Sequence, residues 1–540
     1  MARSPTDAME NIQYTDLISR ASAFPRHIYR PLPESLLHSA FIPSPEEEIA
    51  IRETIQDVNT TLAAVNDEIA RLRGALSELE EYRSSLHTIL KHQQAPLSPI
   101  RRLPPEILGE IFLFASSGCT IQWPPSPRRL LASAGQDDMP WLLCQICSYW
   151  RTAAISFPKL WHSVHLNLQY PSRVAEAQSF LGLCLERSKN ELLTLSIEGN
   201  GLTAMLPILE MLLVHSERWE DVSLSSDFFF DFRENFALAK NRVPNLRRLC
   251  IETTLEDLPP SRPLEAFEDA PNLRELSMTH IIHPLQNFRV PWSQITHFIS
   301  KGNTFREGEF TQIMRHMTNL ISFSTEGERI LEVASSQPVL LPHLEKLTII
   351  NKGSYISKTF QFITAPNLQE LVIHAITPFM AEQTVAMIIR SQCKPQRLAF
   401  RASLDIDALW DENLGVVWML TELPSLRHLE LNVLKSAHHI MPRLVNSRKS
   451  SLPSLLPNLE SFVLEDRFCV SAGEVTEVLA SRIINFNSDD VVDSGSTETP
   501  PGLRAINLRL FPPAAPKFPE LDLLKRVAEN HGVEITIFSG

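Results

Sequence analysis

Two small groups of residues in this chain have side chains that could bind a metal or act in catalysis. Cys144 and Cys147 have the two-residue separation at which paired thiolates bind zinc. A structural zinc ion needs four ligands, and no second Cys or His pair follows at matching spacing, so we interpret the two cysteines as small apolar residues on a helix. His438 and His439 are adjacent and lack the spacing and the glutamate of an HExxH zinc site.

Motifs typical of nucleotide-binding and hydrolytic enzymes are missing from the sequence. It contains no GxSxG, GxxxxGK[ST] or GxGxxG. Phosphate-binding loops depend on Gly, and only 17 of the 540 residues are Gly. We therefore expect a protein that is not an enzyme, with no catalytic residues, no metal and no cofactor.

Charge and cysteine content narrow the range of partners and compartments. The chain has 50 Lys and Arg against 63 Asp and Glu, a formal net charge of -13, which argues against nucleic acid as a partner. It has no run of about 18 apolar residues, so we expect no membrane partner. Its 7 cysteines do not suit a disulfide framework, which favours an intracellular protein of the cytoplasm or nucleus.

A long helix is predicted for residues 44–95, after an irregular segment at 1–43. Ser44 can cap it and Pro45 suits its first turn. Apolar residues then recur in alternating steps of four and three, as in a coiled-coil heptad. They are Ile51, Ile55, Val58, Leu62, Val65, Ile69, Leu72, Leu76, Leu79, Leu86 and Leu90. This narrow stripe needs a cover, which is either a second copy in a parallel or antiparallel homodimer or the next domain of the same chain.

A small helical block is predicted for residues 97–162. The run Leu103-Pro104-Pro105-Glu106 begins a helix, since proline suits a first helical turn. Apolar residues follow at helical spacing, then a loop at 116–139 and a second apolar segment at 141–166.

From residue 161 onward a short pattern recurs: apolar, two variable residues, apolar, one variable residue, apolar. It appears thirteen times, fully or degraded, from Trp161/Val164/Leu166 to Leu503/Ile506/Leu508, mostly at intervals within the ~20–29 residues of leucine-rich repeats. A proline often precedes it, as in APNLREL, and amphipathic stretches lie between occurrences. Each unit is therefore predicted to be helix, turn and short strand, with parallel strands stacked side by side and helices outside.

The fold class expected is thus α/β: a long heptad helix, a small all-helical block and a leucine-rich-repeat solenoid over 161–540. An ordinary α/β domain with parallel strands is the other fold weighed, but doubly wound nucleotide folds bring Gly-rich first turns, which this chain lacks. Near the end, residues 487–502 read as an acidic loop and 533–538 as a final strand.

The block resembles an F-box domain, most closely the F-box-like domains of mushroom-forming fungi. The resemblance rests on the Leu-Pro-Pro-Glu start, the Cys147…Trp150-Arg151 segment and the Pro158…Leu160-Trp161 exit. An F-box joined to repeats resembles the substrate receptors of SCF-type ubiquitin ligases. The resemblance implies that the block docks on a Skp-type adaptor, which links to a cullin, and that the repeats bind a protein substrate.

Two sets of site residues follow. By resemblance, adaptor binding would involve Leu103, Pro104, Pro105, Glu106, Ile107, Leu108, Ile111, Phe112, Cys147, Trp150 and Arg151. The alternative for Ile107, Leu108 and Ile111 is a place in the core of the block, and Trp161 is expected to form the packing joint to the first repeat. Substrate binding is expected from the strand positions that alternate with the buried ones. These are Arg248, Glu252, Glu275, Lys346, Glu370, His374, His428, Glu430, Asn432 and Glu465, a mixed set that we read as mildly acidic toward the C-terminal half.

Two other functional classes stay open at this point. One is an F-box protein that works outside a ligase, as a scaffold whose heptad helix oligomerises. The other is a repeat-domain inhibitor or sensor in which the F-box-like block only caps the solenoid, since terminal repeats need covering.

Overall fold

The structure is a computed structural model in which two compact units divide the chain, Met1–Pro104 and Pro105–Gly540. It describes residues 42–116, 120–124, 139–168, 173–199, 205–225, 232–252, 263–330, 337–351, 358–374, 378–401, 412–433, 443–444, 455–466, 477–478, 481–482, 504–510, 525–526, 529 and 533–539. The predicted irregular segment, apart from its last two residues, and the acidic loop at 487–502 lie outside these ranges. Among the described helices, none combines the length and apolar character that crossing a membrane requires.

The first unit contains the predicted long helix, α3 (Pro45–Gln94). Its start is a capping box. The Ser44 amide donates to Glu47 Oε2 at 2.9 Å, and the Glu47 amide donates to Ser44 Oγ at 3.4 Å. Two short 3-10 turns follow, η2 (Ala95–Leu97) and η3 (Pro99–Arg102). No residue of α3 is buried.

The second unit begins with the helical block, α4 (Pro105–Ala115), α5 (Met139–Ile146), α6 (Ser148–Ser156) and the 3-10 turn η6 (Pro158–Leu160). Gly109 lets α4 approach this turn closely, since a Cβ there would lie 2.3 Å from the ring of Phe157. We had expected both cysteines on one helix, but they do not lie on one. Cys147 is extended between α5 and α6, where its Sγ accepts a hydrogen bond from the Trp150 amide at 3.5 Å.

The repeats form one parallel sheet of 15 strands in the order β1-β2-β3-β4-β5-β6-β7-β9-β12-β14-β15-β16-β17-β18-β19. All thirteen occurrences of the predicted pattern fall on strands, β2 to β18 in this order, and the predicted last strand is β19. The strands after β2 are β3 (Leu193–Gly199), β4 (Trp219–Ser225), β5 (Arg248–Glu252), β6 (Glu275–Thr279), β7 (His297–Lys301), β9 (Ser322–Glu326), β12 (Lys346–Ile350), β14 (Glu370–His374), β15 (Arg397–Arg401), β16 (His428–Val433), β17 (Ser461–Asp466), β18 (Ala505–Leu510) and β19 (Glu534–Ser539).

The sheet starts earlier than predicted. The segment 116–139, which we read as a loop, contains β1 (Ile121–Trp123), which pairs in parallel with β2 (Ser163–Leu168) at the register Ile121↔Val164. This strand, which belongs to the helical block, pairs with the backbone N–H and C=O groups along the edge of β2. The parallel sheet of the repeats therefore begins before residue 161, with a strand from within the block.

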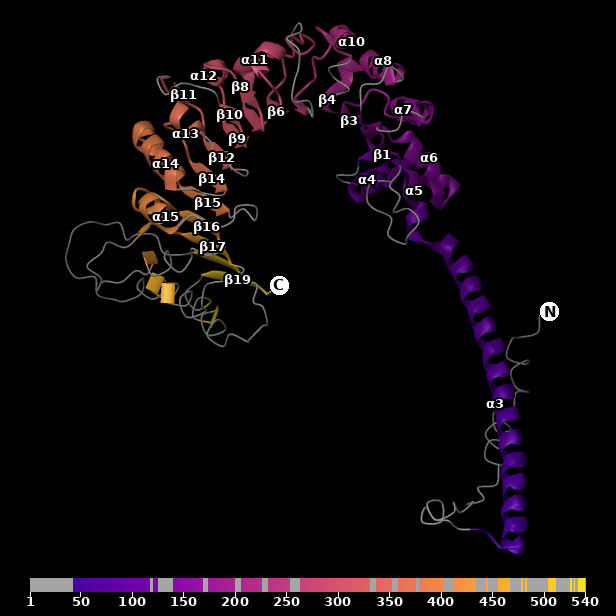
Figure 1. Cartoon of the computed structure of the whole chain (residues 1–540). Coiled ribbons are helices and arrows are strands. Elements are labelled where there is room, and N and C mark those ends of the chain that lie inside the picture. Colours follow the sequence, from indigo (N-terminus) through magenta and orange to yellow (C-terminus); the bar gives the residue numbers. More distant parts are fainter. Residues whose placement is uncertain are drawn as a thin grey trace. The chain divides into compact units, whose positions relative to one another are not determined.

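Helices lie on one side of this sheet, as Figure 1 shows for α7, α8, α12, α14 and α15. The helices of the repeats are α7 (Val174–Arg187), α8 (Leu206–Val214), α10 (Arg233–Phe236), α11 (Pro284–Asn287), α12 (Glu309–His316), α13 (Thr359–Phe362), α14 (Pro378–Ser391) and α15 (Glu412–Thr421). The expectation of a helix in each unit holds only in part. Central units contain single turns such as α11, and two pairs of two-residue strands lie there: β8 (Thr304–Phe305) with β10 (Arg329–Ile330), and β11 (Val339–Leu340) with β13 (Ile363–Thr364).

Asparagines join neighbouring repeats through a feature that the sequence pattern did not reveal. In the recurring Pro-Asn-Leu start, the Asn side-chain amide donates to a backbone carbonyl of the preceding unit. Examples are Asn272 to the Pro244 carbonyl at 2.7 Å and Asn367 to the Pro342 carbonyl at 2.7 Å. Asn245, Asn319 and Asn458 make equivalent bonds of 2.8–2.9 Å. The recurrence of Asn at this position was the available signal.

Candidate protein-interaction surfaces

The residues predicted to bind an adaptor divide between surface and core. Pro105, Glu106, Ile107 and Ile111 are exposed on α4. Leu108 and Phe112 are buried in the core of the block, which for Leu108 is the alternative weighed above, so neither side chain is exposed to an adaptor. Phe112 instead packs against Trp150 of α6, with ring centroids 4.8 Å apart, and so holds the two helices together.

The remaining predicted adaptor residues have local roles. Cys147 is half-buried and caps α6, as described above. Arg151 is largely exposed, but its Nε donates to the Cys144 carbonyl at 2.8 Å and so links α6 to the end of α5. Leu103, half-buried, and Pro104, exposed, belong to the first unit.

Three exposed apolar residues on these helices were missed. Phe114 is 84% exposed and lies seven residues after Ile107, so that Ile107, Ile111 and Phe114 share one face of α4. Leu142 and Ile146, four residues apart on α5, are 40% and 54% exposed. The signal in the sequence was a second apolar stripe on α4 beside the one through Leu108 and Phe112. We call Ile107, Ile111, Phe114, Leu142 and Ile146 the apolar helix surface.

An aromatic joint packs the helical block on the first repeat. Trp161 is fully buried, and its Nε1 donates to the Ala154 carbonyl of α6 at 2.8 Å. Trp141 of α5 packs edge-on against it at 4.9 Å. The guanidinium of Arg187, from α7, lies 4.4 Å from the Trp161 ring centroid and 5.0 Å from that of Trp141.

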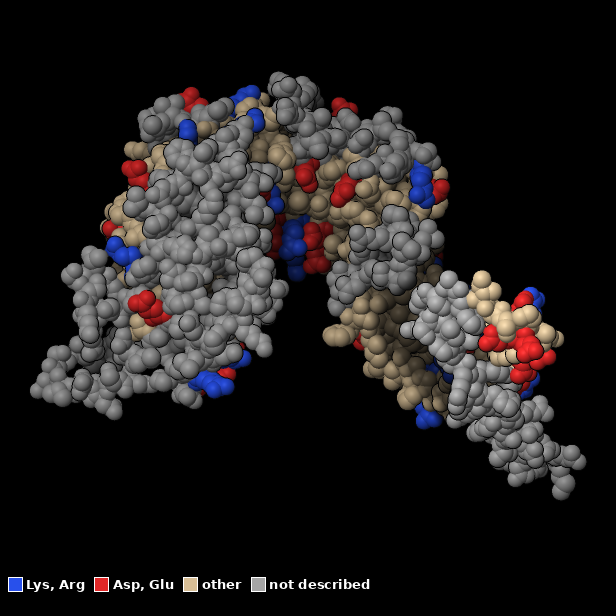
Figure 2. Space-filling view, turned by 60° about the horizontal axis from the view of Figure 1, so that its bottom comes forward, with Lys and Arg blue, Asp and Glu red and all other residues tan. Residues whose placement is uncertain are grey.

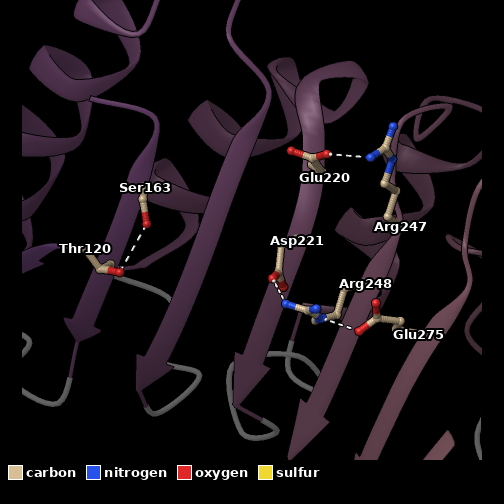
Figure 3. A network of polar contacts seen from close by, with 7 residues as sticks. All are labelled: Thr120, Ser163, Glu220, Asp221, Arg247, Arg248 and Glu275. Carbon is tan, nitrogen blue, oxygen red and sulfur yellow. Dashed lines mark hydrogen bonds and ion pairs between the residues drawn. The ribbon is translucent and has the colours of Figure 1, made fainter. Parts of the chain in front are cut away.

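The predicted substrate residues whose side chains the structure describes lie on the face of the sheet opposite the helices, which we call the open face. Figure 3 shows the first part of it. Arg248 lies between two acidic residues of neighbouring strands: its Nη1 is 2.7 Å from Asp221 Oδ2 and its Nε is 2.7 Å from Glu275 Oε2. Burial raises the pKa of Asp221, and Arg248 opposes that shift. The hydrogen bond to Glu275 raises the pKa of Arg248. Charges here are therefore matched across strands.

The same matching recurs farther along the sheet. Lys346 Nζ lies 3.0 Å from Glu370 Oε1, and Arg401 Nε lies 3.2 Å from Glu430 Oε1. Burial lowers the pKa of His374, and the nearby Arg401 adds to the effect. Burial and Arg397 likewise lower the pKa of His428, so both imidazoles are neutral at pH 7.

The described side chains do not support an acidic bias on the C-terminal half of this face. From β12 onward Lys346, Arg397 and Arg401 equal Glu370, Glu430 and Glu534 in number. Register places Glu370 between Lys346 and Arg397, whereas Glu534 lies beside Ala505. Figure 2 shows the same mixture of Lys or Arg next to Asp or Glu side chains in the hollow of the second unit. Glu252 is exposed and Asn432 half-buried, whereas the side chain of Glu465 lies outside the described part.

Within the ranges that the structure describes, no group of three or more His, Cys, Asp or Glu side chains is arranged to hold a metal ion. His438 and His439 lie outside those ranges. The described residues thus form two candidate surfaces for protein partners: an apolar one on helices and a charged one on strands. The chain matches no protein-family model and no curated protein.

Proposed function

We propose that this chain is the substrate-recognition subunit of an SCF-type ubiquitin ligase. In this proposal helices α4 to α6 dock on a Skp-type adaptor that links to a cullin, and the open face binds a protein substrate. The observation that carries it is the apolar helix surface, where Phe114 is 84% exposed. Exposed apolar side chains that share one helix face, as Ile107, Ile111 and Phe114 do on α4, mark protein-interaction sites, because leaving them in water is unfavourable.

The open face supports the substrate half of the proposal. Its charges lie in cross-strand pairs such as Arg248–Glu275 and Lys346–Glu370. Exposed pairs of this kind contribute little to stability. A partner with the complementary order of charges can replace the cross-strand partners one by one, which gives specificity more than affinity. We therefore expect a substrate segment carrying both signs of charge.

The packing around Trp161 supports a receptor that acts by holding its substrate at a fixed distance from the adaptor. Because Trp161 is fully buried between the helical block and the first repeat, a substrate on the nearby strands would keep a constant distance from the docked adaptor. Holding a target near a reactive partner raises its effective concentration, which is the whole contribution of a non-catalytic receptor.

The test is capture of the adaptor and cullin from cell extract by the full chain. Ile107→Asp combined with Phe114→Asp places charge on the apolar helix surface, and we expect capture to fall at least tenfold, because a desolvated carboxylate opposes docking. Glu110→Ala is the matched control, since Glu110 is exposed on the same helix. Circular dichroism checks that the variants fold. Undiminished capture by the double variant, or no capture by the unmodified chain, contradicts the proposal.

A scaffold that works outside a ligase is the second candidate. It is favoured by the exposed apolar stripe on α3, which suits self-association. A chain that associates with itself, yet captures no cullin when the adaptor is supplied, would establish this alternative.

A further inference from the structure

The stripe of α3 is uncovered along the helix. Seven of its apolar residues are between 41% and 57% exposed: Ile55, Leu62, Ile69, Leu76, Leu79, Leu86 and Leu90. The other four, Ile51, Val58, Val65 and Leu72, are only half-buried. A two-stranded coiled coil buries such a stripe against an identical one.

We propose that α3 forms a parallel two-stranded coiled coil with α3 of a second copy of this chain. The spacing assigns the core positions without ambiguity. Positions a are Ile55, Leu62, Ile69, Leu76, Arg83 and Leu90, and positions d are Ile51, Val58, Val65, Leu72, Leu79 and Leu86. The proposal is independent of the ligase function.

Charge complementarity supports the parallel direction. In the heptad, Glu68 occupies position g and Arg73 position e of the next repeat, and a parallel coil places g beside e of the partner. Each dimer would then contain two Glu68–Arg73 pairs related by symmetry. Glu68 already accepts hydrogen bonds from Arg71 on its own helix, so its carboxylate would be shared between Arg71 and Arg73 of the second copy. Arg73 has no ion-pair partner among the described residues of its own chain, which leaves its guanidinium available to this contact.

The antiparallel arrangement lacks this complementarity. With full overlap of the two helices, each a position faces a d position, and Leu76 faces Val65. Glu68 then lies opposite Ala75, and Arg73 lies opposite Asn66. No flanking position would pair opposite charges.

Arg83 at an a position favours two strands over more. In a two-stranded coil its long side chain can bend its guanidinium toward water, whereas a larger bundle encloses it. The carboxylate of Glu80, on the same helix, lies 4.0 Å from Arg83 and partly neutralises it.

The first experiment is sedimentation equilibrium of the full chain at micromolar concentration. We expect a dimer that Leu76→Lys converts to monomer, with a dissociation constant raised roughly a hundredfold or more, because the charge enters an apolar layer. Ser77→Lys, next to Leu76 but outside the stripe, should leave the dimer unchanged. A monomeric unmodified chain, or equal effects of the two variants, overturns the proposal.

The second experiment tests direction. Arg73→Glu should weaken the dimer roughly tenfold, because two attractive pairs become repulsive. Glu68→Arg combined with Arg73→Glu should restore it, since the pairs re-form with reversed signs. In an antiparallel dimer the two changes would be additive, which contradicts the parallel arrangement.

A crosslink provides an independent check. Val65→Cys should give a disulfide-linked dimer on a non-reducing gel, because Val65 faces its own copy only in the parallel coil. Ser77→Cys and the unmodified chain are the controls. A crosslink that requires Val65→Cys and Leu76→Cys together would instead show an antiparallel dimer.

Discussion

Apolar residues recur periodically in two regions of this molecule with opposite results. On α3 they lie four and three residues apart, and none is buried. In the repeats they occupy alternate strand positions, and residues such as Leu249, Leu276 and Phe323 are at most 1% exposed. The difference shows that periodicity alone does not bury a side chain.

Geometry explains the difference. Apolar residues along one face of a single straight helix cannot bury one another, so they are buried only when another surface packs against them. A repeat unit pairs its strand with the next unit and covers its apolar positions with its own helix or turn, so every added unit completes the one before it. The experiments below test how separate the two regions are.

The largest effect is expected in the core of the repeats. Phe298 and Phe323 stack on adjacent strands with ring centroids 5.6 Å apart, and both are buried. Phe323→Ala should lower the free energy of unfolding of the repeats by about 3–5 kcal/mol, because it removes buried apolar area and leaves a cavity. Urea denaturation followed by amide hydrogen exchange measures this loss.

The matched change on α3 is Leu76→Ala. It should alter unfolding of the repeats by less than about 0.5 kcal/mol, since Leu76 is 57% exposed. Comparable losses for Phe323→Ala and Leu76→Ala would mean that the apolar stripe of α3 packs on the repeats and that the two regions do not differ in this way.

The buried carboxyl group of Glu328, just after β9, should make the stability of the repeats depend on pH. Burial raises the pKa of Glu328 from 4.5 to about 7, although the hydroxyls of Ser300, Thr325 and Thr359 oppose the shift. Between pH 4.5 and 7 the unfolded chain loses this proton while the folded chain keeps it, so stability falls as pH rises. Glu328→Gln should remove that slope and stabilise the repeats by about 3 kcal/mol at pH 7.5.

The free energies of unfolding of the unmodified chain and of Glu328→Gln, each at pH 4.5 and pH 7.5, measure how stability depends on pH. On α3 the sign is reversed, because hydrogen bonds from Ser44 lower the pKa of the exposed Glu47, which favours the folded cap at neutral pH. A slope that survives Glu328→Gln would assign it to other groups.

The smallest effect is expected on the open face. Arg248→Ala removes both of its ion pairs, yet its side chain is 53% exposed. The free energy of unfolding should fall by about 1 kcal/mol or less, since solvent screens exposed pairs. Thermal melts at low and at 0.5 M salt measure it, and a loss of several kcal/mol would show that the ladder is structural rather than available to a partner.

Much of the fold was predictable because it depends on local pattern. The recurring pattern placed strands at all thirteen occurrences, and Ser44, Pro45 and Glu47 marked the start of α3. Strand β1 was not predictable, because three residues within a long Pro-rich segment have no period of their own. Only pairing with β2 makes them a strand.

The candidate surfaces were predictable in part. Strand alternation placed Arg248, Lys346 and Glu370 on the open face. The balance of charge there depended on register, which sets Lys346 directly beside Glu370 and brings Arg401 within diagonal reach of Glu430 on the next strand. On α4 both stripes are apolar, so the sequence could not tell Leu108 and Phe112, which face the block, from Ile107 and Phe114, which face solvent.

The sequence by itself therefore determined the long helix and the strands of the recurring pattern, because capping residues and apolar spacing act within a few residues along the chain. The tertiary structure alone decided which apolar face is covered, where the sheet begins and which charges meet. Those outcomes depend on contacts between units distant in sequence. Trp161 was expected at the joint to the first repeat, but no local pattern encodes its packing against Trp141 and Arg187.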